Sequence, residues 1–535
     1  MPEPLIQGPE CSVCHGHLHR TRSCPHVRGW PRLSGAARTY IEADYAAIRS
    51  VGQSVFEQQS RRDYLLATAG VSIIVLPFVL GHKSLLHWFL LPTIACGILA
   101  GVDLVRWLRG RLELFDPMTM IACVAFYGFF LTPVLHVTWN YFGVGNDMPL
   151  WGDWRPWLGG MAALNAIGLL VYRLAQHESF RRTNPSRRRW KIDAKKFYPL
   201  ATLALASSIA GVLEFISQFG GIPEMIRDFE YNREAFAGKG WLLVFAWPLA
   251  VLSFITLSYM WSERSRLRHP LIIGLILVCT FGIVHFVLMG WYGSRSATVW
   301  ALFWMAGIIH YRFRKFSRRA MAAGVIFLIC FMYFYGFYKE RGRTGLEILS
   351  TPANWFDPEG FQRNIKYVLL EDLARADVTA YLLHNMVKGS TDYDFRWGLT
   401  YLGALSILIP RNIWPDRPSP KVEAGTEALW GKGAVWPSSR MYGLNGEAML
   451  NFGPLGIIPL FAIFGTVVGW FRRKLSSWSK QDSRMFLAPF FVSMVIAALV
   501  YDSDVLVFFM LTEGALICTF ICAASRQIKK TTATP

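Results

Sequence analysis

Residues 65–81 have the sequence LLATAGVSIIVLPFVLG, an apolar run without a charged side chain. Similar runs of roughly 20 residues recur as far as Ala524, and each is long enough to cross the hydrocarbon core of a bilayer. The 535-residue chain is 53% hydrophobic and 17% charged, whereas a soluble domain has about 25% charged residues. We therefore expect an all-α polytopic membrane protein, which excludes soluble enzymes, coiled coils, collagen-like chains and disordered proteins.

The apolar runs predict twelve membrane spans interrupted by one large loop. The expected parts of the chain are a basic, disordered tail over 1–64, nine spans over 65–338, a loop over 339–448, three spans over 449–524 and a short tail over 525–535. The twelve expected spans cover residues 65–81, 85–105, 117–137, 157–172, 197–218, 241–260, 270–291, 296–311, 320–338, 449–471, 485–501 and 505–524.

Basic residues mark one side of the expected membrane protein. Seven segments carry 36 of the 55 Lys and Arg residues, and they alternate with loops that carry few. Because short loops rich in Lys and Arg stay in the cytoplasm, both termini are expected there. The net charge of +19 is thus an orientation signal and does not indicate a nucleic-acid partner. The basic segments are 1–64, 106–116, 173–196, 261–269, 312–319, 472–484 and 525–535.

The loop over 339–448 is expected on the outer, periplasmic side. Its 13 basic and 13 acidic residues cancel, and it contains the apolar patch GLTYLGALSILIP at 398–410. This patch is too short to span a bilayer, so it favours a re-entrant or interfacial helix. A large ordered loop beside a membrane is a typical place for a functional site, although a structural lid or docking surface is the alternative.

Several arginines of the outer side are candidates for binding phosphate. Gly293-Ser294-Arg295 lies between two expected spans, where a helix N-terminus and a guanidinium together suit a pyrophosphate. The alternative is an interfacial arginine that extends to lipid headgroups. The loop adds Arg375 in EDLARADVTAYLL, which begins an amphipathic helical pattern, and then Arg411, Arg417 and Arg440.

Two polar residues lie at the expected entrance to the tenth span. Glu447 and Asn451 are four residues apart, so they share a face if a helix begins there. A carboxylate at the start of a helix is stabilised by the helix dipole, which is a purely structural explanation. A carboxylate near a sugar hydroxyl can also act as a general base.

The order of these features resembles the Wzy-type O-antigen polymerases, a family of bacterial oligosaccharide repeat-unit polymerases. The similar segments are GSRSATVWALF at 293–303, RAD at 375–377, GLTYLGALSILIPRNIWPDRP at 398–418 and SSRMYGLNGEAMLNFGPLG at 438–456. The likeness covers roughly residues 200–520 and rests on the shared order of weak motifs. Arg417 departs from it, because the family pattern has Lys at that position of Trp-Pro-x-Lys-Pro; either cation can contact a phosphate.

The resemblance implies a GT-C-like glycosyltransferase that joins undecaprenyl-pyrophosphate-linked repeat units on the outer leaflet of the bacterial inner membrane. Arg295, Arg375 and Arg411 are then expected to bind pyrophosphate and to stabilise the leaving group without a metal or cofactor. Arg417 and Arg440 are weaker candidates, and Asn451 is a further substrate contact. Glu447 is the first candidate for the base and Asp377 the second. The implied partners are membrane lipid and the chain-length regulator and flippase of the same pathway.

Two other functions remain open at this point. An O-antigen ligase would have a catalytic histidine in the large loop, where His384 lies outside the similar segments. A flippase or secondary transporter would show internal repeats, which the sequence lacks.

Some polar residues are given a structural explanation. The tail cluster Cys11-x-x-Cys14-His15 lacks standard zinc spacing, and the basic run 181–196 suits anionic lipid. Asp392 and Asp394 are interpreted as solvent-facing polar residues of the outer loop. For ionisable residues in or near spans we expect satisfied interior contacts. These residues are Asp103, Glu214, His285 and Glu513.

Overall fold

The computed structural model describes most of the chain beyond its first 58 residues. Residues 63–535 form one compact unit, to which the helices below belong. The tail of 1–58, with its Cys and His cluster, lies outside the described residues, as do Gly293 and Arg411. The described residues are 59–143, 152–185, 188–227, 239–262, 269–287, 294–350, 355, 364–407, 409, 413–434 and 440–529.

The described residues contain nine helices that are long and apolar enough to cross a membrane, which makes the chain a polytopic membrane protein. The stretches expected at 270–291 and 485–501 form shorter apolar helices, and the stretch expected at 296–311 forms the helix that begins at Arg295. Each of the twelve expected stretches thus contains helix, although some residues within them, among them 86–89 and Gly453, are not helical. The nine long helices are Gln59–Gly81, Leu90–Leu108, Pro117–Trp139, Arg155–Arg182, Ala194–Ser217, Gly240–Met260, Arg318–Arg341, Pro454–Ser476 and Ser503–Ala523.

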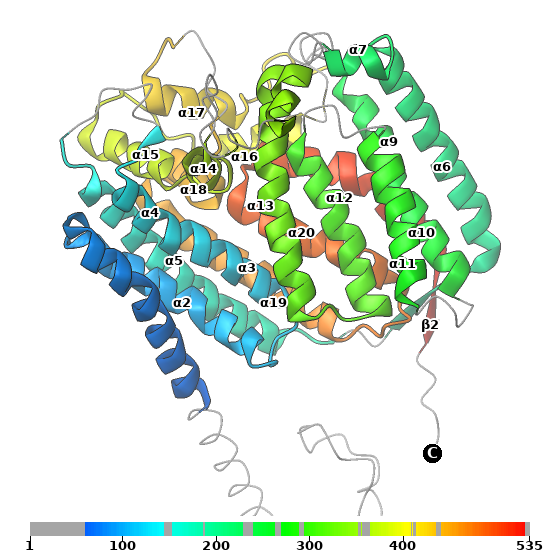
Figure 1. Cartoon of the computed structure of the whole chain (residues 1–535), viewed down its shortest axis with the longest axis horizontal. Coiled ribbons are helices and arrows are strands. Elements are labelled where there is room, and N and C mark those ends of the chain that lie inside the picture. Colours follow the sequence, from blue (N-terminus) through cyan, green and yellow to red (C-terminus); the bar gives the residue numbers. More distant parts are fainter. Residues whose placement is uncertain are drawn as a thin grey trace, which may run out of the picture. The chain divides into compact units, whose positions relative to one another are not determined.

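The first half of the helical body runs from the helix Gln59–Gly81 to α10 (Figure 1). The helix Gln59–Gly81 is followed by the short 3-10 turn η2 (Lys83–Leu85). Of the two small strands, β1 belongs to this half of the chain and β2 to the second half. The elements are α2 (Leu90–Leu108), α3 (Pro117–Ala125), η3 (Phe126–Leu131), α4 (Thr132–Trp139), α5 (Arg155–Arg182), β1 (Arg188–Ile192), α6 (Ala194–Ser217), α7 (Ile222–Arg227), η5 (Gly240–Leu242), α9 (Leu243–Ala246) and α10 (Leu249–Ser262).

The second half contains the remaining apolar helices and the loop helices between them. The apolar elements are α11 (Pro270–Leu277), η7 (Val278–Val287), α12 (Arg295–Ile308), η9 (Ile309–Phe313), α13 (Arg318–Arg341), η13 (Pro454–Gly456), α19 (Ile457–Ser476), η14 (Ser483–Phe486), α20 (Ala488–Val500), α21 (Ser503–Phe509), η15 (Met510–Ala515), α22 (Leu516–Ala523) and β2 (Ser525–Lys529). The elements between α13 and η13 are η10 (Gly342–Ser350), α14 (Ile365–Tyr367), η12 (Val368–Asp372), α15 (Ala376–Lys388), α16 (Leu399–Ser406), α17 (Lys421–Trp430) and α18 (Gly443–Phe452).

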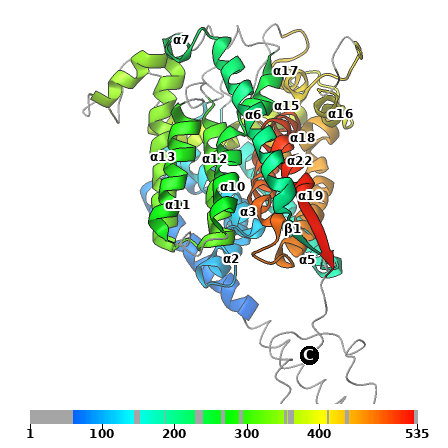
Figure 2. The ribbon, with the colours of Figure 1, turned by 90° about the vertical axis from the view of Figure 1, so that its right-hand side faces the viewer.

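The loop helices lie together at one end of the helical body, which we call the loop end (Figures 1 and 2). They are not a separate layer, because Leu382 of α15, Leu429 of α17 and Leu450 of α18 are buried in the same apolar core as Phe461 of α19. The loop therefore shares its core with the membrane helices, and this packing fixes the side chains that it carries.

The expected cytoplasmic segments meet at the opposite end, which we call the basic end. There β1 pairs antiparallel with β2, with Trp190 opposite Gln527. Arg472 Nε lies 2.9 Å from a carboxylate oxygen of Asp116, and the Trp190 N–H donates to Asp482 over 3.3 Å. Four of the segments that are basic in the sequence are thereby joined at one end.

The tenth span differs from its expected bounds. A separate helix, α18, ends at Phe452, and the span begins at Pro454, five residues after the expected start. The break lies at Gly453, whose φ of 73° is unfavourable for other residues, and the following proline cannot continue the preceding helix. Glu447 and Asn451 thus lie on a loop helix and not at the entrance of the span.

The ionisable residues of the spans are partly explained as expected. Asp103 pairs with Arg173 over 2.7 Å, and His285 Nε2 lies 3.2 Å from the Thr298 hydroxyl. Glu214 is exposed and accepts a bond from Gln218 over 2.5 Å. Glu513 differs, because it is buried and its Oε1 has no hydrogen-bond partner among the described residues.

Candidate active site

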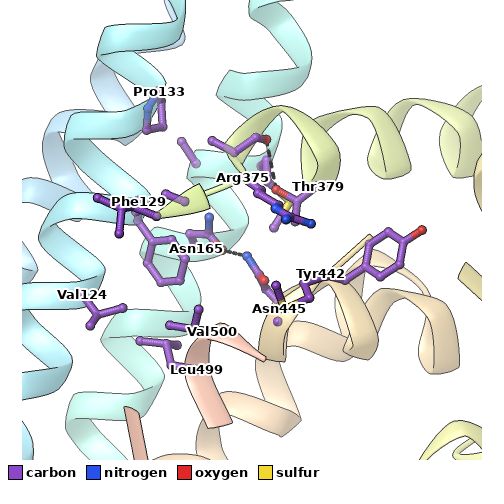
Figure 3. A pocket seen from close by; sticks show the side chains of 18 of the residues that line it. Val124, Phe129, Pro133, Asn165, Arg375, Thr379, Tyr442, Asn445, Leu499 and Val500 are labelled. Carbon is purple, nitrogen blue, oxygen red and sulfur yellow. Dashed lines mark hydrogen bonds between the residues drawn. The ribbon is translucent and has the colours of Figure 1, made fainter. Parts of the chain in front are cut away.

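A pocket with a volume of about 130 Å³ opens between the membrane helices and the loop helices at the loop end (Figure 3). Its apolar wall comes from η3, α4, α5 and the end of α20, and its polar wall from the residues that precede and begin α15 and α18. Its polar lining residues are Asn165, Asp372, Arg375, Thr379, Tyr442, Asn445 and Tyr501.

Arg375 provides a positive charge on the pocket wall. It precedes α15, and its Nε donates to the backbone carbonyl of Glu371 over 2.7 Å. This bond uses one of the five N–H groups of the guanidinium and holds the half-buried side chain beside Thr379 and Tyr442 (Figure 3). The other N–H groups leave capacity to bind an anion at the wall. The expectation of an amphipathic helix after Arg375 is confirmed by α15.

Arg295 contributes to the same wall indirectly. Its two terminal nitrogens lie 2.6 and 2.7 Å from the two carboxylate oxygens of Asp372, and Asp372 lines the pocket. Ser294 caps the start of α12 by accepting a hydrogen bond from the Ala297 N–H. The Gly-Ser-Arg turn expected to bind phosphate therefore places its arginine on a neighbouring carboxylate.

Two buried carboxyl groups, those of Glu371 and Asp377, lie together near Arg375. Asp377 is fully buried in the first turn of α15, and its carboxyl group is within hydrogen-bonding distance of the buried carboxyl group of Glu371. The Glu371 group packs so closely on Gly143 that a Cβ there would lie 1.3 Å from Oε1. Arg440 approaches the other oxygen of Glu371 with 3.5 Å between Nη1 and Oε2.

The environment of Glu371 favours its neutral form. Burial and, next, the negative charge of Asp377 raise the pKa of Glu371 to about 8, although Arg375 and Arg440 act in the opposite direction. A carboxyl group held neutral near pH 7 beside an ionisable partner can exchange a proton with it. The cluster therefore has the groups needed for acid–base chemistry.

Glu447 lies away from this pocket and is fully hydrogen-bonded. Its carboxylate accepts bonds from the Thr400 hydroxyl over 2.7 Å, from the Ser503 N–H over 2.7 Å and from the Ser503 hydroxyl over 2.5 Å. Burial raises the pKa of Glu447 to about 7, and Asp502 contributes to this rise. These contacts join α18, α16 and α21, which is a structural role for the first candidate base.

Asn451 works with Glu447, as their spacing of four residues predicted. Its side-chain amide donates to the Glu447 carbonyl over 2.9 Å and to the Thr400 hydroxyl over 2.7 Å, and its oxygen accepts from the Gly398 N–H over 2.9 Å. Asn451 therefore anchors the turn before α16, and its side chain does not line the pocket.

The two remaining loop arginines lie in different surroundings. Arg417 donates to the carbonyls of Ser406 and Ile409 over 3.0 and 2.9 Å, so it satisfies the end of α16. This helix, Leu399–Ser406, forms within the patch expected to be re-entrant or interfacial. Arg411 lies outside the described residues and stays a prediction.

A second buried ion pair lies beside the pocket, and no motif in the sequence points to it. Lys421 of α17 is almost fully buried and pairs with Asp502, which lies between α20 and α21. Asp502 also accepts bonds from the N–H groups of Tyr442 and Gly443 over 3.0 and 2.9 Å. The pair thus holds the pocket residue Tyr442 against the membrane helices.

Within the described parts of the chain, no three His, Cys, Asp or Glu side chains are grouped as they would be around a metal ion. The pocket has a cation, Arg375, on its wall, and the buried carboxyl groups of Glu371 and Asp377 lie near that cation.

Comparison of the chain with protein-family models, with curated proteins and with solved structures gives no match.

Proposed function

We propose that the chain is a glycosyltransferase that polymerises undecaprenyl-pyrophosphate-linked oligosaccharide repeat units, in the synthesis of O-antigen, capsule or exopolysaccharide. One observation carries this proposal. Arg375 lies on the wall of a pocket at the loop end, and the buried carboxyl group of Glu371 is close enough to both Arg375 and Asp377 to feel their charges. A cation for a diphosphate leaving group and a base for an acceptor hydroxyl are thus available at one place.

Arg375 is the residue we assign to the pyrophosphate. The sugar's bond to the diphosphate breaks during transfer, so negative charge grows on the leaving oxygen, and a nearby guanidinium stabilises that charge. Arg295 has an indirect role in this assignment, because its ion pair with Asp372 fixes the segment that precedes Arg375. Arg440 and Arg411 remain candidates for further phosphate contacts, Arg440 through its position beside Glu371.

Asp377 is favoured over Glu447 as the base. The Glu447 carboxylate accepts three hydrogen bonds from residues of two other helices, and it does not line the pocket. Asp377 directly follows Ala376, which does line the pocket. The order of the two candidates expected from the sequence is therefore reversed in this proposal.

We infer a topology of twelve spans with both termini in the cytoplasm of a bacterial cell and with a GT-C-like arrangement of the helices. The meeting of four basic segments at one end, with the loop helices at the other, supports this orientation. The pocket then faces the outer side of the inner membrane, where lipid-linked repeat units are presented. A flippase and a chain-length regulator of the same pathway are the proposed partners, besides membrane lipid.

The ligase alternative is less favoured. Its catalytic histidine would have to be His384, which is buried, packs edge-on against Trp157 and does not line the pocket. A flippase would move the repeat unit without breaking a bond, so it needs neither a base for an acceptor hydroxyl nor a cation for a leaving group.

Deletion of the gene in its native host and return of single variants test the proposed function. Loss of the protein should abolish the polymer and leave single repeat units attached to the final acceptor. A ligase defect would instead leave polymer on its lipid carrier, and a flippase defect would leave repeat units on the cytoplasmic face. Gel ladders of the polysaccharide and analysis of the lipid-linked fraction separate these outcomes.

A further inference from the structure

Three buried titratable side chains meet where α4 packs against the start of α15. Asp377 and His136 are fully buried, and His136 Nε2 lies 3.8 Å from Oδ1 of Asp377. Glu371 completes the group through its carboxyl contact with Asp377. Glu371 Oε1 and His136 Nε2 both lack a hydrogen-bond partner among the described residues, so each has an unused site for a proton or for a hydrogen bond.

The hydrogen bond made by Nδ1 of His136 shows which of its two ring nitrogens carries the hydrogen. Nδ1 lies 2.6 Å from the backbone carbonyl of Tyr141. A carbonyl can only accept a hydrogen bond, so Nδ1 must carry the hydrogen. In the neutral ring Nε2 then has a free lone pair, which faces Asp377. This lone pair can accept a hydrogen bond from Asp377 only when Asp377 is protonated.

Glu371 and Asp377 cannot both be ionised without a large cost. Two like charges at hydrogen-bonding distance in a buried site repel each other strongly, and a shared proton removes this repulsion. Burial and the charge of Asp377 raise the pKa of Glu371 to about 8, which agrees with the geometry. The other charged or titratable groups that face the cluster are Tyr141, Tyr367, Arg375 and Arg440.

We propose that Glu371 and Asp377 hold one proton between them and, with His136 as the next acceptor, form a relay that takes up the proton released by the acceptor hydroxyl. The inference rests on the proposed function and adds to it two residues, Glu371 and His136. In the transfer, the acceptor oxygen bonds to the anomeric carbon, and the bond from that carbon to the diphosphate breaks. The electron pair of the broken bond leaves with the diphosphate, and the hydroxyl proton moves to the carboxyl pair.

The position of the relay suits a proton that arrives through one water molecule. Ala376 lines the pocket, and Asp377, the next residue in the chain, is fully buried and does not line it, so a water molecule has to connect the pocket with the pair. A base that acts through a single water is an established arrangement. Once the pair has taken a second proton, the His136 lone pair stabilises protonated Asp377 and so keeps the proton from returning.

Infrared spectroscopy of the purified protein in nanodiscs tests the shared proton without any activity assay. At neutral pH the wild type should show a protonated-carboxyl band that is lost in Glu371→Gln, because Asp377 then has no second acid with which to share a proton. The band should be weakened in Asp377→Asn, because the negative charge that adds to the effect of burial on the pKa of Glu371 is gone. Asp392→Asn is the matched control, since the Asp392 side chain is 96% exposed. If either variant keeps the full band, the proton is not shared and the inference is wrong.

The pH dependence of polymerisation tests the role of the relay. The wild-type rate should rise as the pair loses a proton, and in Glu371→Gln this acidic limb should move to lower pH by at least about one unit, since the like charge is gone. A purely structural role would lower the rate equally at every pH. His136→Gln should lower kcat about tenfold and leave the infrared band in place; an unchanged kcat would exclude His136 from the relay.

The two measurements separate the inference from the function on which it rests. A shared-proton band in a protein that makes no polymer from lipid-linked repeat units would refute the proposed function and leave the carboxyl pair. Polymer formation with an unchanged acidic limb in Glu371→Gln would refute the relay and leave the function.

Discussion

The guanidinium of Arg295 binds the carboxylate of Asp372 through two parallel hydrogen bonds of 2.6 and 2.7 Å. This geometry is the strong, two-pronged form of an arginine–carboxylate pair, and the two side chains are only 10% and 5% exposed. The pair connects the first residue of α12 with the last residue of η12, three residues before Arg375. Arg295, which the sequence predicts to bind phosphate, therefore helps to position Arg375.

Arg295→Ala and Asp372→Asn should each lower polymer formation and stability, and their effects should not add. Removal of one partner takes the opposite charge away from a nearly buried ion, which costs about 3 to 5 kcal/mol. A double variant should lose little more than either single variant. Thermal unfolding in detergent and polymer ladders measure the two effects. Arg295→Lys is the matched control, since it keeps the charge and loses the two-pronged geometry; fully additive losses would mean that Arg295 acts separately from Asp372.

Glu447→Gln should destabilise the protein and leave the chemistry in place. The glutamine oxygen can still accept a bond, but the Ser503 N–H and hydroxyl no longer both find an acceptor, and a lost buried hydrogen bond costs about 1 to 3 kcal/mol. We expect a lower unfolding temperature with a normal chain-length ladder at permissive temperature. Glu423→Gln on the exposed side of α17 is the control. A stable Glu447→Gln protein without polymer would restore Glu447 as the base.

Lys421→Met should loosen the loop end. The substitution leaves Asp502 buried without its cation, although Asp502 keeps the N–H groups of Tyr442 and Gly443. The expected loss is about 3 to 5 kcal/mol of unfolding free energy. Combining it with Asp502→Asn should restore part of the stability, because asparagine removes the uncompensated charge and still accepts a hydrogen bond. Unfolding of the single and double variants in detergent measures this, and a double variant less stable than Lys421→Met would contradict it.

The helices could be predicted from the sequence more completely than the site. Hydropathy located every expected span on a helix, and the amphipathic pattern after Arg375 located α15. The RAD motif contains Arg375, which lines the pocket, and Asp377, which is fully buried near Glu371. The helix predictions succeed because they depend on residues close together in the chain.

The remaining site residues depend on contacts between distant segments. Glu371 is an ordinary acid in the sequence, and it becomes notable only because η12 turns its carboxyl group onto Gly143 and toward Asp377. Lys421 and Asp502 are 81 positions apart and belong to different parts of the fold. The sequence order alone cannot show such pairs.

The free energy of unfolding should fall as the pH rises from about 4.5 to about 8. In this range Glu371 is protonated in the folded protein and ionised in the unfolded chain. Its pKa rises from an ordinary value of 4.5 to about 8 on folding, so between these pH values the folded protein binds more protons than the unfolded chain. Stability then decreases with pH across this window, by up to about 1.4 kcal/mol for each unit of pH. Glu371→Gln is always neutral, so its unfolding temperature should vary less with pH than that of the wild type. Equal slopes from pH 5 to about 8 would contradict a proton held by Glu371.

Arg375→Ala should abolish polymer formation without unfolding the protein. The guanidinium lies on the pocket wall, and one of its N–H groups donates to the Glu371 carbonyl, so its removal takes away a charge that the diphosphate needs and only one internal hydrogen bond. Loss of a donor that stabilises developing negative charge lowers kcat on the order of 100- to 1000-fold. Lys388→Ala, on the exposed end of the same helix, is the matched control and should polymerise normally. Arg375→Lys keeps the charge as a single point, so an intermediate rate is expected if the contact with phosphate is two-pronged. A wild-type ladder from folded Arg375→Ala would show that the diphosphate binds elsewhere, and Arg440 and Arg411 would then be the arginines to test.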